Sequence, residues 1–362
     1  YANLLDFSPL NFNIVKKGTD IKENQLNLRT CSKEKIEITP GSPNVQAGKF
    51  ALDALQLAIT DIKNGLITDL LTCPIDKKTT TDAGLSFNGH TQFLANEFES
   101  DVQMILMNEE LRVSMVTGHT SLNNVANSIT KESVLNHIRL INENLKADFA
   151  IIKPKIAVLG INPHGGDNGL MGREELDVIA PAVKEAQKEN ILVVGPYAPD
   201  GFFGSKNSTN FDGVIGMYHD QVLIPFKQLA FTDGINYTAG LPIIRTSPDH
   251  GTAYDIAGKG IGDTTSFINA LYLINKVRRN RINYYDNTKE TVILLKQSNF
   301  YEPIHLYQQT ESIVVSKTSE TVYVLQRGDY ISNNNVFNIN NQPVYKLKQG
   351  ETRSNATVFK KT

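Results

Sequence analysis

The spacing of apolar residues predicts alternating helices and strands up to about residue 280. An apolar residue every three or four positions predicts helices at 51–62, 93–98, 134–145 and 174–189. Short runs rich in β-branched residues predict strands at 69–75, 102–107, 111–116, 155–161, 191–194 and 213–217. Strands separated by helices are typical of βαβ units, so the pattern predicts an α/β fold with a largely parallel sheet.

Local signals sharpen three of these elements. Gly65 should end the first helix, and Thr130 is placed to cap the helix at 134–145. The polar segment 108–110 lies between two strand-like runs, so it predicts a hairpin.

Beyond Asn280 the amino-acid composition changes: Asn, Gln, Ser and Thr become frequent, and the helical spacing of apolar residues disappears. Short alternating runs such as 312–315 and 322–325 predict strands instead. The segment 322–329 is echoed by 344–351, and each weakly resembles the opening of a LysM-type carbohydrate-binding repeat without its helical remainder. We therefore expect 285–362 to be a β-rich extension of unknown role, with a binding module as the alternative.

Bulk composition excludes several classes of function. A chain of 362 residues suits two domains or two with an appendage. Lys and Arg number 36 against 38 Asp and Glu, a net charge of -2, which argues against a general nucleic-acid or membrane-surface binder and favours a small-molecule partner. No apolar stretch reaches the roughly 18 residues of a membrane span. We expect a cytoplasmic protein in which Cys31 and Cys73 are buried free thiols.

Three histidines each follow a predicted strand. His119 comes after the run at 111–116, His164 after the run at 155–161 and His219 after the run at 213–217. Ligands of open α/β sheets bind at this edge, and three imidazoles leave a metal coordination position for substrate. The pattern therefore favours a metal-assisted enzyme. A single loop histidine is more commonly just hydrogen-bonded, and the long separations require assembly by the fold or across subunits.

A glycine-rich loop runs from Gly165 to Gly172 and leads into a helix that begins with Glu174 and Glu175. The simplest interpretation is a loop and a helix start whose carboxylates complement the helix dipole. A phosphate cradle is the alternative, although no Walker lysine follows. The dinucleotide fingerprint is also missing, so a nicotinamide cofactor would have to bind in a non-Rossmann manner.

Lys227, Asn236 and Arg245 follow the third histidine in a stretch that is otherwise largely apolar or glycine. Lys and Arg are ordinarily surface charges. Together with a metal site, however, they would suit an anionic substrate, because Arg recognises carboxylate or phosphate with two parallel hydrogen bonds.

Several motifs resemble the family of 4-hydroxythreonine-4-phosphate dehydrogenases, in that family's order. The motifs are His90-Thr91, His119, Asn162-Pro163-His164, Met217-Tyr218-His219-Asp220-Gln221, 240–247 and 249–253. The resemblance covers roughly residues 5–280. In addition, 250–260 is similar to the adenosine-binding loop of isocitrate and isopropylmalate dehydrogenases, which bind NAD without a Rossmann fingerprint.

The resemblance implies roles for individual residues. The divalent metal, zinc with magnesium or cobalt as alternatives, would be bound by His119, His164 and His219. The phosphorylated substrate would be bound by His90, Thr91, Lys227, Asn236 and Arg245. NAD would be bound by His250, Gly251, Thr252, Ala253, Asp255 and Gly258. Lys227 and Asp220 are the candidate catalytic groups, for proton transfer and as a carboxylate beside the metal.

The resemblance also implies architecture and reaction. It implies an α/β/α homodimer with an interfacial active site, in which 1–115 and 246–284 form one domain and 116–245 the other. The reaction would be NAD-linked oxidation and decarboxylation of 4-phosphooxy-L-threonine in pyridoxal phosphate synthesis. The alternatives are a dehydrogenase of erythronate or threonate 4-phosphate and an inactive descendant that serves as a binding protein. The family's opening strand and Thr-Pro-Gly-like turn have no counterpart before Tyr1, and the tail after Asn287 has none in the family.

Overall fold

The computed structural model describes residues 11–16, 20–34, 36–37, 39–84 and 89–287, and the backbone of short strands beyond residue 300. The chain divides into two compact units, Tyr1–Arg278 and Arg279–Thr362. All the candidate site residues lie in the first unit.

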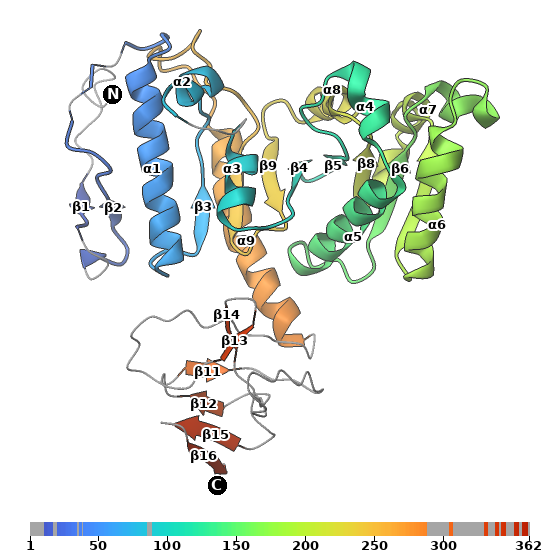
Figure 1. Cartoon of the computed structure of the whole chain (residues 1–362). Coiled ribbons are helices and arrows are strands. Elements are labelled where there is room, and N and C mark those ends of the chain that lie inside the picture. Colours follow the sequence, from blue (N-terminus) through green and yellow to red (C-terminus); the bar gives the residue numbers. More distant parts are fainter. Residues whose placement is uncertain are drawn as a thin grey trace. The chain divides into compact units, whose positions relative to one another are not determined.

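An eight-stranded sheet forms the centre of the first unit (Figure 1). In spatial order its strands are β3 (Asp69–Leu71), β10 (Ile244–Pro248), β9 (Ile235–Ala239), β4 (Gln103–Met107), β5 (Arg112–Met115), β8 (Gly213–Gly216), β6 (Lys155–Leu159) and β7 (Leu192–Tyr197). The pairs β3/β10, β5/β8, β8/β6 and β6/β7 are parallel, whereas β10/β9, β9/β4 and β4/β5 are antiparallel. The predicted α/β fold and the predicted β4–β5 hairpin are confirmed.

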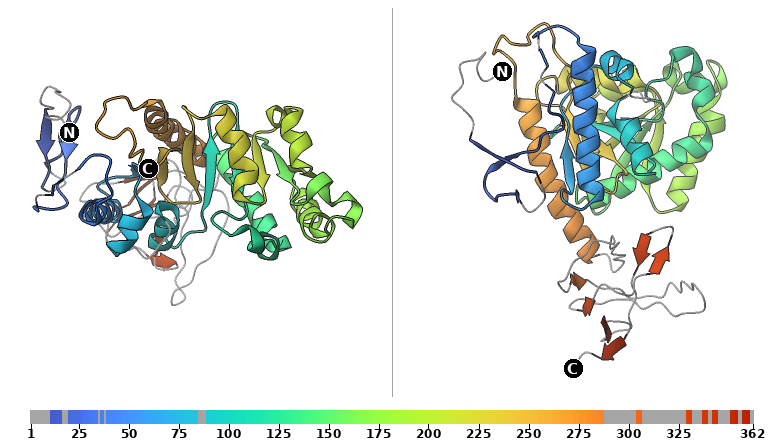
Figure 2. Two further views of the ribbon diagram at one scale, coloured as in Figure 1. Left: turned by 90° about the horizontal axis from the view of Figure 1, so that it is seen from above. Right: turned by 60° about the vertical axis from the view of Figure 1, so that its left-hand side comes forward.

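Helices cover both faces of this sheet. Figure 2 shows α1, α3, α5 and α6 on one side and α8 and α9 on the other. The helices are α1 (Val45–Lys63), α2 (Lys77–Asp82), α3 (His90–Glu97), α4 (Leu122–Ser128), α5 (Lys131–Ala147), α6 (Ala180–Lys188), α7 (Pro199–Gly204), α8 (His219–Leu229) and α9 (Thr265–Asn287). Three short helical turns are η2 (Pro163–Gly169), η3 (Glu175–Ile179) and η4 (Asn207–Asn210), and a parallel pair is formed by β1 (Phe12–Ile14) and β2 (Leu26–Leu28).

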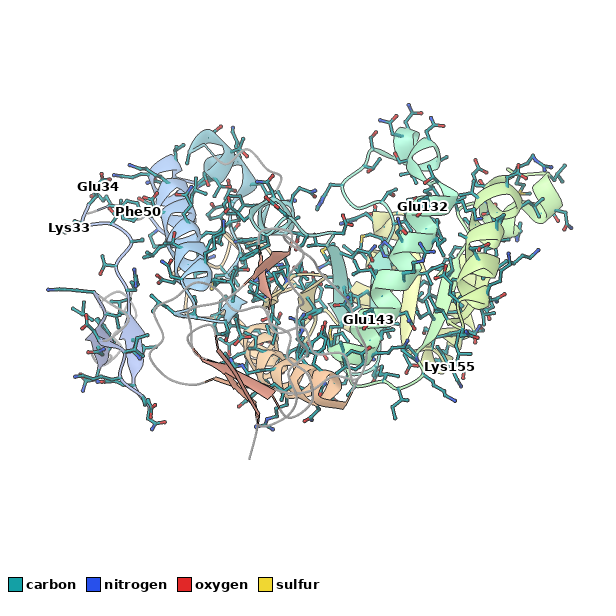
Figure 3. All side chains as sticks on the ribbon, turned by 60° about the horizontal axis from the view of Figure 1, so that its bottom comes forward. Lys33, Glu34, Phe50, Glu132, Glu143 and Lys155 are labelled. Carbon is teal, nitrogen blue, oxygen red and sulfur yellow. The ribbon has the colours of Figure 1, made fainter. Side chains whose placement is uncertain are left out.

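Helix α5 shows how the apolar spacing produces the core. Its residues Val134, Ile138 and Leu145 are at most 1% exposed and pack into one large cluster with β4, β8 and β6. Glu132 and Glu143 lie on the solvent side (Figure 3). The predicted N-cap Thr130 accepts a hydrogen bond from the Ser133 amide and completes a capping box. The local pattern thus fixes both the start of α5 and the face that it buries.

The expectation of buried thiols is wrong. Cys31 and Cys73 are free, as expected, but both are exposed. Strand β3 ends at Leu71 rather than at Ile75, so Cys73 lies in the following loop. Pro74 accounts for the short strand, since proline has no amide hydrogen to donate to a neighbouring strand.

Beyond α9 the second unit is described only in short strands: β11 (Ile304–Leu306), β12 (Asp329–Ile331), β13 (Phe337–Ile339), β14 (Gln342–Val344), β15 (Glu351–Ser354) and β16 (Thr357–Lys360). They form a four-stranded sheet in the order β11-β12-β15-β16 and the hairpin β13-β14. The predicted strands at 312–315 and 322–325, and most of the echoed segments, lie outside the described residues. Within the part of the chain that is described, no helix is long and apolar enough to cross a membrane.

The division of residues 1–284 into two α/β domains stays a prediction. Strands from both predicted domains alternate within the one sheet, since β9 lies between β10 and β4. Helix α9 continues to Asn287, slightly past the predicted start of the extension at 285.

Candidate functional site

The carboxyl ends of three adjacent strands bring the predicted metal ligands to one edge of the sheet. Strands β5, β8 and β6 are neighbours and run parallel. His119 lies in the loop after β5, His219 is the first residue of α8 after β8, and His164 lies in η2 after β6. The predicted strand-end placement is therefore confirmed for all three histidines.

His119 and His219 lie side by side. Their ring centroids are 5.8 Å apart, and Nδ1 of His219 is 2.6 Å from the Asp220 carboxylate. A carboxylate on one ring nitrogen orients a histidine and leaves Nε2 as the free ligand atom. Burial lowers the pKa of His119, and the neighbouring Lys77 and His219 lower it further. The lowered pKa suits His119 to metal binding, because neutral imidazole is the ligating form.

His164 does not join this pair within one chain. Among the described residues, no group of three or more His, Cys, Asp or Glu side chains could hold a metal ion. The exposed His164 lies in a left-handed turn, with φ values of 54° at His164 and 64° at Gly165. The three-histidine site predicted from the sequence therefore stays a prediction.

Lys77 is a site residue that the sequence analysis missed. It begins α2 after β3, and its Nζ lies 3.2 Å from Nε2 of His119. A cation thus lies against the nitrogen that would bind a metal, which shows that this position accepts positive charge. The strand-end rule could have identified Lys77, because it also follows a parallel strand.

Arg245 provides a positive charge inside the sheet. It lies on β10 and is only 2% exposed, and its guanidinium donates to Thr238 Oγ1 at 2.9 Å and Thr72 Oγ1 at 2.7 Å. Among the described residues, its buried Nε has no hydrogen-bond partner. Burial lowers the pKa of Arg245 to about 10, so it remains charged at neutral pH. The expectation that such a cation is ordinarily a surface charge is wrong here.

His90, Thr91 and Asn236, which the sequence also assigned to anion binding, come from helix α3 and strand β9. His90 begins α3, and its pKa is lowered to about 3 by burial and by the charge of Arg245. Asn236 lies on β9 next to β10, and its buried Oδ1 has no partner among the described residues. Thr91 is the second residue of α3. Gly89, the N-cap of α3, has no side chain that could accept a hydrogen bond from the first backbone amides of this helix. These amides are therefore available to an anion as far as the described residues show.

Lys227 is held by an acidic residue whose role the sequence analysis did not recognise. Its Nζ donates to the carboxylate of Asp249 at 3.1 Å and to the Asp249 carbonyl at 3.2 Å. Burial raises the pKa of Asp249, while the Lys227 ammonium opposes that shift. Lys227 is thus fixed in position at the end of β10, close to the start of the predicted cofactor loop.

The predicted cofactor loop follows β10 and is largely exposed. His250 Nδ1 lies 2.9 Å from the Gly251 carbonyl, and Ala253 and Gly258 have φ values of 48° and 81°. No described atom lies within 4 Å of where a Cβ on Gly251 would be, so a flat ring could approach the backbone there. Thr252 and Asp255 belong to the same loop.

The fold and the histidine-lined sheet edge define an α/β protein of the dehydrogenase type. Similar solved structures include a 4-hydroxythreonine-4-phosphate dehydrogenase from Klebsiella pneumoniae, with a TM-score of 0.64, 32% identity and coverage of 76% of this chain and 85% of that one. A terephthalate 1,2-cis-dihydrodiol dehydrogenase from Burkholderia xenovorans shares the fold, with a TM-score of 0.52 and 24% identity over 74% of this chain and 84% of that one.

Residues 1–274 match the family model of the pyridoxal phosphate biosynthetic protein PdxA, and the chain belongs to that family. It is 46% identical over 273 residues to the 4-hydroxythreonine-4-phosphate dehydrogenase of Bacteroides thetaiotaomicron, covering 75% of each chain. It is 44% identical over 274 residues to that of Aquifex aeolicus, covering 75% of this chain and 84% of that one. The family resemblance found in the sequence is confirmed.

Proposed function

We propose that this chain is a dehydrogenase that oxidises and decarboxylates 4-phosphooxy-L-threonine to 3-amino-2-oxopropyl phosphate in pyridoxal phosphate synthesis. The observation that carries the proposal is the environment of Arg245, which is buried and, among the described residues, pairs only with two threonine hydroxyls. A buried guanidinium without a carboxylate partner is costly, so an anionic ligand would complete its pairing. The names of the relatives support a phosphorylated substrate.

In this proposal Arg245, Asn236, His90 and Thr91 hold the phosphate. The pKa of about 3 means that His90 is neutral at pH 7 and can donate one hydrogen bond to a phosphate oxygen. Fixing this remote phosphate positions the reacting carbon at the histidine-lined edge.

The lowered pKa of His119 and its position beside His219 fit a divalent metal, with zinc as the first choice and magnesium or cobalt as alternatives. When bound there, the metal would stabilise negative charge on the substrate oxygen during oxidation and loss of CO2. His119 and His219 would come from one chain, and His164 from a second copy. A homodimer with an interfacial site is therefore part of the proposal, since the described residues of one chain do not bring three ligands together.

Oxidation transfers a hydride from the C3 carbon of the substrate to NAD. The hydroxyl proton would leave to solvent, whereas Lys227, held by Asp249 as an ammonium, would donate the proton that replaces CO2 on the substrate carbon; Asp220 orients His219. The loop with His250, Gly251, Thr252, Ala253, Asp255 and Gly258 would hold NAD. A cytoplasmic location is part of the proposal, because NAD and phosphorylated intermediates of this kind are metabolites of that compartment.

The decisive experiment measures NADH formation with 4-phosphooxy-L-threonine, erythronate 4-phosphate and threonate 4-phosphate in parallel, with zinc, magnesium or cobalt added. We expect turnover of the amino substrate to exceed that of the two sugar acids. Faster turnover of a sugar acid would reassign the substrate. If no substrate gives NADH while metal and phosphate still bind, the chain is an inactive descendant.

A further inference from the structure

Glu175 is a buried carboxylate that belongs to none of the groups described above. It is 2% exposed at the start of η3. Its Oε1 accepts hydrogen bonds from the backbone amides of Ile161 and Asn162, both at 2.7 Å, and its Oε2 accepts one from Asn162 Nδ2 at 2.9 Å. All three donors lie in the segment that joins β6 to His164.

Two glycines allow the carboxylate to come this close. A Cβ on Gly160 would lie 2.8 Å from Oε1 of Glu175, and a Cβ on Gly166 would lie 2.7 Å from Oε2. Gly160 precedes His164 and Gly166 follows it. Glu175 therefore contacts the chain on both sides of the histidine, and each contact leaves no room for a side chain.

The backbone between these contacts needs such support. Residues 164–168 all have positive φ, with values of 54° at His164, 44° at Asp167 and 55° at Asn168. A residue with a side chain is disfavoured in this region, and three such residues in one turn persist only when surrounding contacts hold them. The hydrogen bonds that the buried Glu175 carboxylate accepts from Ile161 and Asn162 provide such contacts.

The neighbouring carboxylate has a different role. Glu174 Oε2 accepts a hydrogen bond at 2.7 Å from the same Asn162 amide nitrogen, but it has no hydrogen bond to the backbone of the loop in the described structure. The sequence suggested that both glutamates simply complement a helix dipole. Only Glu175 faces inward and binds the backbone that leads to His164.

We propose that Glu175 is the positioning residue of His164: its carboxylate holds the turn in the one conformation that presents the imidazole to a divalent metal. The inference rests on the proposed function, because it takes His164 as a metal ligand. Holding the turn in this conformation would favour metal binding, because less order has to be gained when the ion binds.

The test uses the full chain and the variant Glu175→Gln, with Asp177→Asn as matched control. Glutamine keeps an oxygen for the two backbone amides, but its NH2 group faces the donor NH2 of Asn162. Asp177 is an exposed carboxylate two residues later that pairs with Arg173 on the surface. Cobalt and zinc affinities are measured by titration calorimetry. We expect Glu175→Gln to weaken binding about 10- to 100-fold, and Asp177→Asn to leave it unchanged.

Two further readouts separate positioning from general damage. Stabilisation by inorganic phosphate should be the same in wild type and Glu175→Gln. Arg245, the proposed phosphate-binding residue, lies on β10, whereas Glu175 contacts the segment after β6. Amide hydrogen exchange at Ile161 and Asn162 should be faster in metal-free Glu175→Gln. If Glu175→Gln does not fold, Glu175→Asp replaces it, because the shorter carboxylate keeps the charge and should give a smaller loss of affinity.

Unchanged metal affinity in Glu175→Gln, or equal loss of metal and phosphate binding, would overturn the inference. Wild-type protein that binds no metal, or His164→Ala protein with wild-type affinity, would instead overturn the metal site of the proposed function. If the metal site fails in this way, hydrogen exchange still tests the role of Glu175 by itself. Unchanged exchange at Ile161 and Asn162 in Glu175→Gln would show that Glu175 does not hold the turn.

Discussion

At the scale of single residues, sequence motifs identified which side chains to examine but not their state of ionisation. His90 was predicted from the family resemblance alone, and Arg245 also from its place in an otherwise apolar stretch. That Arg245 is buried and that the pKa of His90 is lowered to about 3 depends on the packing around them. Burial is a property of the assembled sheet, so no local pattern could provide it.

The buried Nε of Arg245 has no hydrogen-bond partner among the described residues, and this leads to a prediction about phosphate. Inorganic phosphate should raise the melting temperature of the metal-free wild-type protein, because binding to the folded state stabilises it. Arg245→Gln should bind phosphate at least about tenfold more weakly, since a charge-assisted hydrogen bond contributes roughly 1.5 to 3 kcal/mol. Arg139→Gln, which removes a surface arginine paired with Glu189, is the control. Equal stabilisation by phosphate in Arg245→Gln and wild type would contradict phosphate binding by Arg245.

His137 leads to a prediction about pH. This histidine is 3% exposed on α5, its Nε2 is 2.8 Å from Ser114 Oγ, and burial lowers its pKa to about 3. Ser114 donates its hydroxyl hydrogen to the Met104 carbonyl, so Nε2 of His137 carries a hydrogen and donates to Ser114; the low pKa makes this the neutral tautomer. Between pH 6.5 and 3 only the unfolded state binds a proton at this residue, so stability falls as pH falls through that window.

At pH 5 this single group should cost about 2 kcal/mol relative to neutral pH, because the pH lies about 1.5 units below the ordinary histidine pKa. Urea denaturation from pH 7 to 4.5 measures the loss. His137→Gln keeps an amide donor and cannot titrate, so its pH dependence should be shallower. Parallel pH profiles for the variant and the wild type would show that His137 does not contribute.

At the scale of elements, regular apolar spacing predicted α5, β6 and β8 close to their observed bounds, whereas α1 begins six residues before its predicted start. Strands β9 and β10 were not predicted, because polar residues interrupt their apolar runs: Asn236 lies in β9 and Arg245 in β10. Sequence patterns are expected to fail where polar groups lie in the core. Lys77 is different, since it is exposed at the start of α2 and only the fold shows that it contacts His119.

The capping box of α5 gives a prediction at this scale. Thr130 Oγ1 accepts from the Ser133 amide at 3.0 Å, and Ser133 Oγ accepts from the Thr130 amide at 2.9 Å. Thr130→Ala should lower the free energy of unfolding by about 1 kcal/mol, because it leaves helix amides without a partner. Ser128→Ala, at an exposed position that ends α4, should change it by less. NADH formation should be normal in both, and a Thr130→Ala variant as stable as the wild type would contradict the role of the box.

At the scale of the whole molecule, the extension should be dispensable for the chemistry. The buried residues of α9 end at Val277, and every candidate site residue lies before that position. A chain that ends at Asn287 keeps all of α9 and should retain metal affinity, self-association and NADH formation. Light scattering and metal titration on this truncated chain provide the check. Aggregation or loss of metal binding would mean that residues beyond 287 are part of the catalytic fold.

The proposed metal site, shared between two subunits, makes the strongest demand on the assembly. His119 and His219 are neighbours in one chain, with ring centroids 5.8 Å apart, whereas the described residues of one chain form no group of three possible ligands that would include His164. If the third ligand comes from a second copy, His164→Ala and His219→Ala proteins should each be inactive alone. In a mixed dimer one site then carries both substitutions and the other carries neither.

Refolding the two variants together should therefore restore about a quarter of the wild-type activity, because about half of the dimers are mixed and each has one intact site. Mixing His119→Ala with His219→Ala is the control and should restore nothing, since both ligands come from the same chain. Full inactivity of the first mixture would show that all three histidines act within a single subunit.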